Sequence, residues 1–432
     1  RFASFSAPDA RVLEVRETTL ELASLTVRDG RTNGPFGGVG GCIYAYSARL
    51  GLDHVDVKDC NAHGTGGGVL LTNTVADFGD VEVSGNTANF GGGIALQGKS
   101  SIRAVRTRVS GNRASQWGGA LAAMWYASSP SQSLSQSLYF GDRVSLDGNE
   151  APLGGAIATS YGSGLQLEPI APGNVLAIES NLARDYGGGF WISEPVGDVA
   201  AGSLRGYALA LRNNVTTGSG GAGAAFGHVQ LYDSEVRDNV ALLDGGGVLI
   251  GRSALRSVLE RIALTANLAG SVGGGAFVAG EGSLLRNVSS FANEAATGGG
   301  FHIEAPTQMT HVTSYKDGAT AGSSLNVAAS VELRGSVFAD GCAFGGSGAV
   351  FDLGGNFESA SAPSCGLTAH AVSDFALDFG SFGGGFDVVG ITDPGSILID
   401  ALPQQTNASQ DVRGWTRGAF SDSGAYEFGA TH

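Results

Sequence analysis

The chain lacks the features that identify several large classes of protein. Only 25 of its 432 residues are Lys or Arg, against 40 Asp or Glu, and the net charge is −15. Nucleic acids and anionic membranes attract clustered basic residues, so this balance argues against both as partners. No run of about 18 apolar residues occurs, so no transmembrane segment is predicted. With seven His, four Cys and no C-x-x-C pair, the sequence also argues against a zinc site.

Glycine is abundant, and its distribution is periodic. Many of the 71 glycines stand in runs behind an asparagine, as in VSGNTANFGGG from Val83 and LTANLAGSVGGG from Leu264. Eight anchor asparagines follow this pattern, in steps of 26, 37, 32, 33, 25, 28 and 26 residues: Asn86, Asn112, Asn149, Asn181, Asn214, Asn239, Asn267 and Asn293. We place Asn61 at the anchor position of an earlier coil. An internal repeat of about 20 to 50 residues indicates a solenoid.

Each repeat is predicted to consist of short strands. Segments before the asparagine, such as VEVSGN, alternate apolar with polar residues, and segments after the glycines, such as GGGVLIG, are short and apolar. No segment combines an apolar period of 3.6 residues with helix caps. The predicted fold is therefore all-β, a right-handed parallel β-helix. Residues 1–340 would form roughly ten to twelve coils, and residues 341–432 a terminal coil and a C-terminal cap.

The recurring Asn and Gly residues have explanations in the backbone. Asn tolerates left-handed backbone angles, and its amide can bond the equivalent amide about 4.8 Å away on the next coil. We therefore expect the eight anchor residues to form a structural ladder at one corner. Glycine runs allow positive φ and close approach of backbones where the strand direction turns. A phosphate-binding glycine loop is disfavoured, because such loops open helices and occur once or twice in a chain.

The four cysteines fall into two local pairs, Cys42 with Cys60 and Cys342 with Cys365. Separations of 18 and 23 residues are close to one coil, which would place both members of a pair on neighbouring rungs within reach of a disulfide. Disulfides persist in oxidising compartments, so an extracellular location is expected.

Several segments resemble bacterial surface proteins. The repeat unit is similar to the FxxN and GGA[ILV] repeats of chlamydial polymorphic outer-membrane proteins. The stacked coils, the segment FDLGGNFESASAPSCGL and the ending SILIDAL…DVRG…SGAYEF resemble the choice-of-anchor Q domain proteins. This resemblance implies a β-helix followed by the pair Cys342 and Cys365 and by an ending that here contains Asp400, Asp411, Arg413 and Glu427. The chain departs from the family at Leu402-Pro403, where Gly is usual. The resemblance implies export and surface location, and no biochemical activity.

Catalytic residues are not evident. Carboxylates on adjacent coils could form a glycosidase pair, and the candidates are Asp56 with Asp59, Asp80 with Glu82, and Glu235 with Asp238. Each lies on an alternating strand or beside its corner, where a solvated acid is the ordinary occupant. His302 and His311 could meet across one coil, although merely exposed histidines are the simpler interpretation. The motifs of polygalacturonases, pectate lyases and serine hydrolases are missing. We therefore assign no catalytic residue and no cofactor.

Two sets of residues have competing interpretations. Asp400, Asp411, Arg413 and Glu427 could hold Ca²⁺, but Arg413 is a ready ionic partner, so an ion network that closes the cap is favoured. Six aromatic residues could stack on sugars or pack in the core and corners: Trp117, Trp125, Tyr126, Tyr139, Trp191 and Tyr207.

These features predict an exported bacterial surface protein of structural or adhesin type rather than an enzyme. A stiff scaffold would present the insertions Met124–Leu138 and Glu194–Arg205 to other surface proteins or glycans, or the coils would self-associate. The alternative is a β-helix enzyme that binds or degrades polysaccharide. A groove with clustered carboxylates beside exposed aromatic residues would favour that alternative.

Overall fold

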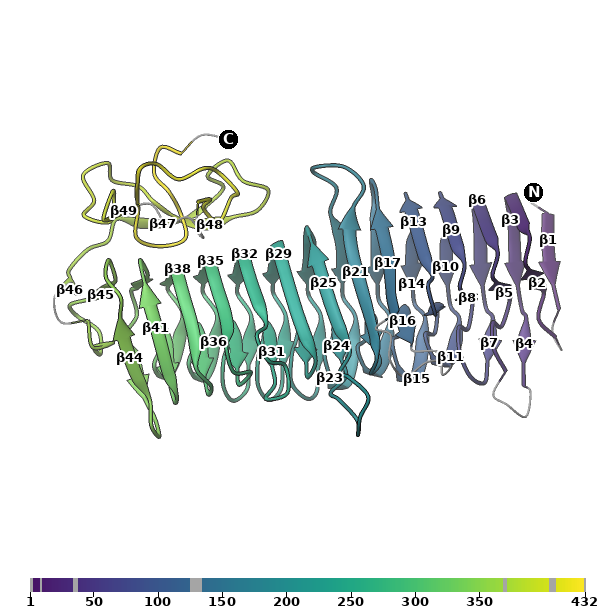
Figure 1. Ribbon diagram of the computed structural model, residues 1–432, viewed down its shortest axis with the longest axis horizontal. Coiled ribbons are helices and arrows are strands. Elements are labelled where there is room, and N and C mark those ends of the chain that lie inside the picture. Colours follow the sequence, from purple (N-terminus) through teal and green to yellow (C-terminus); the bar gives the residue numbers. More distant parts are fainter. Residues whose placement is uncertain are drawn as a thin grey trace. The chain divides into compact units, whose positions relative to one another are not determined.

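The structure, a computed structural model, describes residues 3–7, 10–33, 38–124, 134–367, 371–403 and 409–430. It confirms the predicted fold class. A parallel β-solenoid of about twelve turns spans residues 3–338, and further strands follow it (Figure 1). Among the described residues, no helix capable of spanning a membrane is found.

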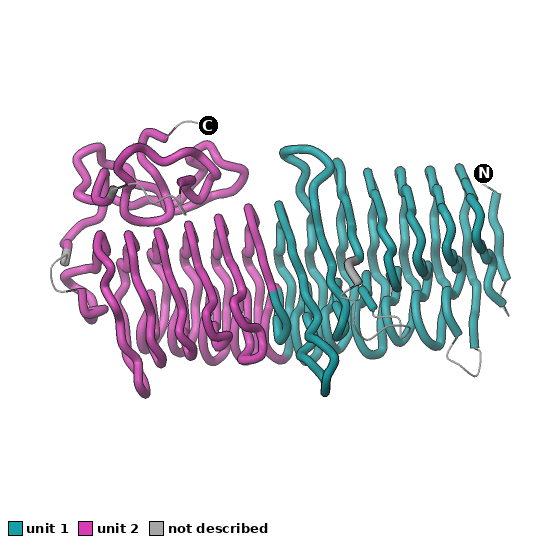
Figure 2. Tube along the Cα trace, viewed as in Figure 1, with its two compact units in different colours: residues 1–217, 223–228 teal, residues 218–222, 229–432 magenta. Residues whose placement is uncertain are grey.

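Contacts divide the chain into two compact units. Unit 1 comprises residues 1–217 and 223–228, and unit 2 comprises residues 218–222 and 229–432 (Figure 2). The sequence-based division at residue 340 separates coils from cap and is a different one; it stays a prediction.

Each coil of unit 1 passes in turn through three parallel sheets, which we call B, A and C. Sheet B contains β2 (Leu13–Arg16), β5 (Ile43–Tyr46), β8 (Val69–Thr72), β12 (Ile94–Gln97), β16 (Leu121–Met124), β20 (Ile157–Thr159), β24 (Phe190–Ile192) and β28 (Gly223–Ala225). Sheet A contains β1 (Ala3–Ser6), β3 (Thr19–Arg28), β6 (Arg49–Lys58), β9 (Val75–Gly79), β10 (Glu82–Ser84), β13 (Ser101–Val105), β14 (Arg108–Ser110), β17 (Leu134–Phe140), β18 (Val144–Asp147), β21 (Ser163–Pro169), β22 (Leu176–Glu179), β25 (Ser203–Tyr207) and β26 (Leu209–Arg212). Sheet C contains β4 (Arg31–Thr32), β7 (Asn61–Ala62), β11 (Thr87–Phe90), β15 (Arg113–Trp117), β19 (Glu150–Leu153), β23 (Leu182–Tyr186) and β27 (Val215–Thr216).

Unit 2 repeats the same order of sheets and adds two antiparallel pairs. Its sheet A strands are β29 (His228–Arg237), β32 (Val258–Thr265), β35 (Ser283–Phe291), β38 (Thr307–Tyr315), β41 (Ser330–Arg334), β42 (Val337–Phe338), β44 (Ala349–Asp352), β45 (Phe357–Ser359) and β46 (Ala371–Val372). Sheet C has β30 (Val240–Ala241), β33 (Leu268–Ala269), β36 (Glu294–Thr297) and β39 (Gly318–Ala321), and sheet B has β31 (Val248–Ile250), β34 (Ala276–Val278), β37 (Phe301–Ile303), β40 (Leu325–Val327) and β43 (Cys342–Phe344). The antiparallel pairs are β47 (Leu377–Gly380) with β48 (Val388–Ile391), and β49 (Leu402–Pro403) with β50 (Phe420–Ser421).

Rung-to-rung register builds the core of each unit. On sheet A of unit 1, Val57 pairs with Val83, and Val83 pairs with Val109. All three side chains are buried. Their neighbours along each strand point to the opposite face, because side chains alternate in a strand. The alternation of apolar and polar residues along each strand therefore produces an apolar column inside the coil and a polar column outside it.

The anchor asparagines stack at the corner between sheets A and C. In unit 1 the backbone N–H and the Nδ2 of Asn86 donate to Oδ1 of Asn112, at 3.0 and 2.9 Å. The same two bonds recur along Asn112, Asn149, Asn181 and Asn214, and in unit 2 along Asn239, Asn267 and Asn293. All eight side chains are buried. The ladder satisfies corner N–H groups that no strand would pair.

At the two ends of the ladder that the structure describes, a residue other than Asn takes the ladder position. In unit 1 the position before Asn86 is filled by Cys60, whose N–H donates to Asn86 Oδ1 at 3.0 Å. The sequence-based placement of Asn61 there is wrong, because Asn61 lies one residue later, on the exposed side of β7. In unit 2 Asp317 continues the ladder, accepting from the N–H and Nδ2 of Asn293 at 2.8 and 2.9 Å.

The glycine runs form the corner between sheets C and B. The first glycine has positive φ, as at Gly91, where φ is 63°. The second lies against the next coil: a Cβ on Gly92 would stand 2.6 Å from the carbonyl oxygen of Gly119. Glycine at these two places therefore has separate causes, one conformational and one steric.

Both cysteine pairs form disulfides, Cys42 with Cys60 and Cys342 with Cys365. Because Cys60 occupies a ladder position, the first disulfide fixes the corner at which the asparagine ladder of unit 1 begins.

Asp317 makes the stability of unit 2 depend on pH. Its Oδ2 accepts hydrogen bonds from the hydroxyls of Ser290 and Ser314, at 2.8 and 2.5 Å. Burial nevertheless raises the pKa of Asp317 to about 7. The unfolded value is about 3.9, so the folded state holds this proton more tightly. The protonated carboxyl of Asp317 therefore stabilises the folded state fully below pH of about 3.9, and this stabilisation is lost as the pH rises through about 7.

We expect Asp317→Asn to remove this component of the pH dependence. The amide continues the ladder without a buried charge, because its oxygen can accept from the N–H and Nδ2 of Asn293 as Oδ1 of Asp317 does. Its nitrogen would lie beside the hydroxyls of Ser290 and Ser314, which can accept a hydrogen bond. Urea unfolding at pH 5 and pH 7 should show the variant gaining on the order of 2 kcal/mol relative to the parent protein over that range. Asn267→Asp, the reverse change elsewhere in the ladder, should weaken the fold as the pH rises. Equal pH dependence of Asp317→Asn and the parent protein would contradict this account.

Candidate functional site

Partly exposed aromatic side chains gather in unit 1 where sheet C turns into sheet B. Phe90 and Trp117 end β11 and β15, and their ring centroids are 4.5 Å apart. Trp117 also lies 6.4 Å from Trp191 on β24. Tyr186, at the end of β23, meets Phe226 edge to face at 4.9 Å. We call these five residues the aromatic strip.

The local sequence explains where the strip forms. Three of its rings immediately precede the first glycine of a run, in NFGGG, QWGG and DYGGG. The positive φ of that glycine turns the chain sharply, and a Cβ on Gly118 would stand 3.1 Å from the Cβ of Ala122. The sheet B column that contains Trp191 is otherwise small along this stretch, with Ala95, Ala122, Ala158 and Ala224 all buried. Large rings thus stand beside small residues, and Tyr186 stays 38% exposed.

The structure brings together two of the six aromatic residues singled out in the sequence, Trp117 and Trp191. Tyr139 and Tyr207 lie elsewhere, on β17 and β25 of sheet A, and Trp125 and Tyr126 lie outside the described residues. Sequence reasoning missed Phe90, Tyr186 and Phe226. The recurrent aromatic residue just before a glycine run would have identified the first two.

A second surface feature of unit 1 is a groove on the outer face of sheet A. It has a volume of about 280 Å³ and runs from β3 to β13. Charged residues line it, namely Glu21, Asp53, Asp77 and Arg103, and the other lining residues are Gly51, Leu52, Phe78, Gly79 and Val105. Asp77 pairs with Arg49 at 2.9 Å, and Asp53 contacts His54 Nδ1 at 3.1 Å. We call this feature the sheet A groove; the sequence did not predict it.

The candidate catalytic carboxylates each have a basic neighbour. The ion pairs are Asp56 with Lys58 at 3.5 Å, Asp59 with Arg28 at 3.5 Å, Asp80 with Arg106 at 2.6 Å, and Glu235 and Asp238 with Arg237 at 3.9 and 3.1 Å. Glu82 stands opposite Arg108 in the register of sheet A. Hydrogen bonds from Arg106 hold the pKa of Asp80 below its usual value, which favours a permanently ionised group over a general acid.

The two candidate histidines lie on different sheets and do not meet. His302 is on β37 of sheet B, stacked on Phe277 at 5.5 Å, and burial lowers its pKa. His311 is on β38 of sheet A, fully buried, with Nδ1 3.1 Å from the carbonyl oxygen of Asp422. Burial holds the pKa of His311 well below its usual value. Both are therefore neutral near pH 7, and neither supports the other in a proton transfer.

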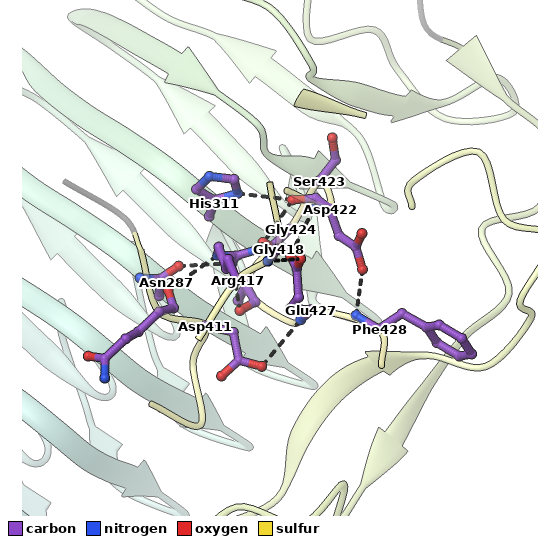
Figure 3. A network of polar contacts seen from close by, with 12 residues as sticks. Asn287, His311, Asp411, Arg417, Gly418, Asp422, Ser423, Gly424, Glu427 and Phe428 are labelled. Atoms are coloured by element: carbon purple, nitrogen blue, oxygen red, sulfur yellow. Dashed lines mark hydrogen bonds and ion pairs between the residues drawn. The ribbon is translucent and has the colours of Figure 1, made fainter. Parts of the chain in front are cut away.

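The C-terminal residues of unit 2 contain two buried ion pairs. One of them, between Arg417 and Glu427, belongs to the polar network drawn in Figure 3. Arg413 pairs with Asp411 at 2.5 Å, and Arg417 pairs with Glu427 at 2.8 Å. Asp411 also accepts from the N–H groups of Arg413 and Trp415, at 2.8 and 3.0 Å. The carboxylate oxygens are thus occupied by donors, an arrangement suited to a charge-assisted network.

Asp400 contributes its backbone rather than its carboxylate, because its N–H donates to Asp422 Oδ1 at 2.9 Å. Sequence reasoning missed Asp422 and Arg417. Arg417 links this segment to the coils, because its Nη2 donates to Asn287 Oδ1 on β35 at 3.0 Å. The same Nη2 donates to the carbonyl oxygens of Gly424 and Ala425 within the segment, at 3.0 Å each. The only sequence signal for Arg417 was that a second Arg stands among glycines, four residues after Arg413.

Further bonds seat the segment on sheet A of unit 2. The N–H of Ala425 donates to Thr313 Oγ1 and that of Val389 to Ser289 Oγ, both at 2.8 Å. An apolar cluster that includes Val337, Val388 and Tyr426 packs between the segment and sheet A.

The sequence contains three Asn-X-Ser/Thr sequons for glycosylation. Two of them, at Asn214 and Asn287, have buried acceptor side chains that are hydrogen-bonded in the folded protein. The third, at Asn407, lies outside the described residues.

Comparisons with known proteins found no match, whether against protein-family models, curated proteins or solved structures.

We expect Arg417→Met to loosen the C-terminal segment. The change leaves Glu427 as a buried carboxylate without its cation, which typically costs about 3–5 kcal/mol. Hydrogen exchange should rise in residues 409–430 and at Ser289 and Thr313, and the unfolding midpoint in urea should fall. The matched control is Arg252→Met. Arg252 is 86% exposed and pairs with Glu304 at 3.4 Å, so this change should cost less than about 0.5 kcal/mol. Equal effects of the two substitutions would rule out a special role for Arg417.

Proposed function

We propose that this chain is an exported bacterial surface protein that binds polysaccharide along the aromatic strip. Export is supported by the two disulfides, which indicate an oxidising, extracytoplasmic compartment. The resemblance to choice-of-anchor Q domain proteins supports a bacterial cell surface as the location. The aromatic strip is the observation that carries the binding function.

The strip suits a sugar chain because of what its rings offer. The C–H faces of pyranose rings stack on aromatic side chains, which combine a large apolar face with partial exposure. Successive coils repeat about every 4.8 Å, so rings on different coils face different units of one extended chain. Polar groups lie on the same strands, with Ser115 bonded to Asn89 at 2.6 Å and Arg113 paired with Glu150 at 3.1 Å. These groups supply hydrogen bonds for hydroxyls.

The solenoid also reduces the entropic cost of binding. Phe90 and Trp117 pair across adjacent strands, and the ladder residues Asn86 and Asn112 fix the preceding corner of the same two coils. Side chains already held in place lose little freedom when a ligand arrives. We favour binding over cleavage because five of the six candidate carboxylates are ion-paired.

Other partners remain as alternative proposals. A structural or adhesin role through other surface proteins, or self-association, would use the insertions Met124–Leu138 and Glu194–Arg205. Residues 125–133 of the first lie outside the described residues, and the second carries a bridge between Val196 and Val199, of which Val196 is 52% exposed.

The test is a polysaccharide panel measured by isothermal titration against the parent protein, Tyr186→Ala and Trp117→Leu. Losing one stacking ring should weaken binding about tenfold, which corresponds to about 1.4 kcal/mol. The matched control is Tyr139→Ala, which removes a 37% exposed ring from sheet A of the same unit. Absence of binding to every polysaccharide, or equal loss in the control, would contradict the proposal. Release of reducing ends during the same experiment would favour the enzyme instead.

A further inference from the structure

A histidine ring lies in the contact between sheet A of unit 2 and the C-terminal segment, by which we mean residues 373–403 and 409–430. His311 is on β38, and its side chain is fully buried. Its Nδ1 lies 3.1 Å from the carbonyl oxygen of Asp422, within the segment (Figure 3). A carbonyl oxygen only accepts hydrogen bonds, so Nδ1 carries the proton of the neutral ring and Nε2 a lone pair.

A second proton on the His311 ring would have no acceptor. In the described part of the chain, the buried Nε2 has no hydrogen-bond partner. Two cations act on the ring, Arg334 from β41 and Arg417 from the segment. Arg417 is itself buried, and its Nη1 donates to the same carbonyl oxygen of Asp422 at 3.3 Å. Protonated His311 and Arg417 would be two buried cations at one carbonyl oxygen, so protonation opposes docking of the segment.

The carboxylates of the segment do not neutralise this charge. Two of them are held in the ion pairs of Glu427 with Arg417 and of Asp411 with Arg413. The carboxylate of Asp422 points away from His311 and toward Phe428, whose N–H donates to it (Figure 3). Its other oxygen accepts from the N–H of Asp400 at 2.9 Å.

His311 and Asp422 give the docking of the segment opposite responses to pH. Burial, together with Arg417, holds the pKa of His311 well below its usual value. Docking is therefore undiminished above about pH 6.5, the pKa of a free histidine, and weakens as the pH falls below it. Burial raises the pKa of Asp422 to about 6. Protonation of Asp422 therefore strengthens docking as the pH falls from about 6 to about 3.9, the pKa of a free aspartate.

We propose that the C-terminal segment is a strap that acid releases from sheet A of unit 2, with His311 driving the release and Asp422 delaying it. Release uncovers Asn287, Ser289 and Thr313, which are buried in the docked form and accept hydrogen bonds from the segment. This inference concerns unit 2 and is independent of the proposed function.

The two opposing groups set the pH at which the strap opens. Between about pH 6 and 4 the docked form gains a proton on Asp422 while the released form gains one on His311, so docking changes little. Below about pH 4 the released Asp422 is protonated as well, and the His311 effect prevails. The coils respond differently, because protonated Asp317 stabilises them in the same range. Acid therefore acts on the strap rather than on the solenoid.

Hydrogen exchange of the full chain at pH 7.5 and pH 5 tests this inference. Protection of residues 411–428 is expressed relative to the intrinsic exchange rate at each pH, and each variant is compared with itself. Asp422→Asn removes the delaying group, so protection should fall about thirtyfold between the two pH values, against about threefold in the parent protein. His311→Asn removes the driving group and should show no fall. Asparagine suits this position, because Asn287 stands opposite it with the same φ of 52°.

The matched control is His302→Asn, which changes a buried histidine on sheet B of the same unit and should keep the profile of the parent protein. Protection of β34, also on sheet B, reports whether the coils stay folded in each variant. A fall in Asp422→Asn that disappears when His311→Asn is added supports the inference. Equal profiles of Asp422→Asn and the parent protein, or a fall that persists in the double variant, would overturn it.

Discussion

The structure depends on one constraint: each coil must pair its backbone with the coils beside it in an unbroken register. A position in the sequence therefore recurs about every 4.8 Å, and a buried polar group must find its partner one rung away. Asparagine meets this requirement because its amide both accepts and donates. The side-chain Oδ1 of Asn149 accepts two bonds from Asn112, and its Nδ2 donates one to Oδ1 of the next ladder residue, Asn181. A residue that only accepts, such as Asp317, changes the ladder's response to pH.

The same register places surface chemistry in columns. On sheet A of unit 1, Asp56, Glu82 and Arg108 form one outward column of charged residues. The sheet A column of unit 2 that faces the C-terminal segment contains Ala263, Ser289 and Thr313 instead. Small and hydroxyl side chains permit close docking and accept hydrogen bonds from the segment, as Ser289 does from the N–H of Val389. Residue type thus distinguishes a covered column from an open one.

The surface features of unit 1 arise at corners and on strand faces. A glycine of positive φ follows Phe90 and Trp117 and turns the chain at the same point of each coil, so aromatic residues placed before it gather into the aromatic strip. The sheet A groove lies instead on the outer face of neighbouring strands, where Gly51 and Gly79 stand among charged residues. Both features consist of residues about one coil apart. Neither requires the long insertions that sequence reasoning favoured as binding elements.

The sequence by itself determined the all-β solenoid, the positions of the anchor asparagines and the pairing of the cysteines. These depend on residues one coil apart, and the repeat spacing reveals such neighbours directly. Only the tertiary structure decided that Cys60 rather than Asn61 begins the described ladder, because an offset of one residue reverses the face of a side chain. It also decided that His302 and His311 lie on different sheets, and that Arg417 reaches Asn287, 130 residues away. Contacts of that range follow from how the C-terminal segment folds back onto sheet A, and no periodicity in the chain encodes them.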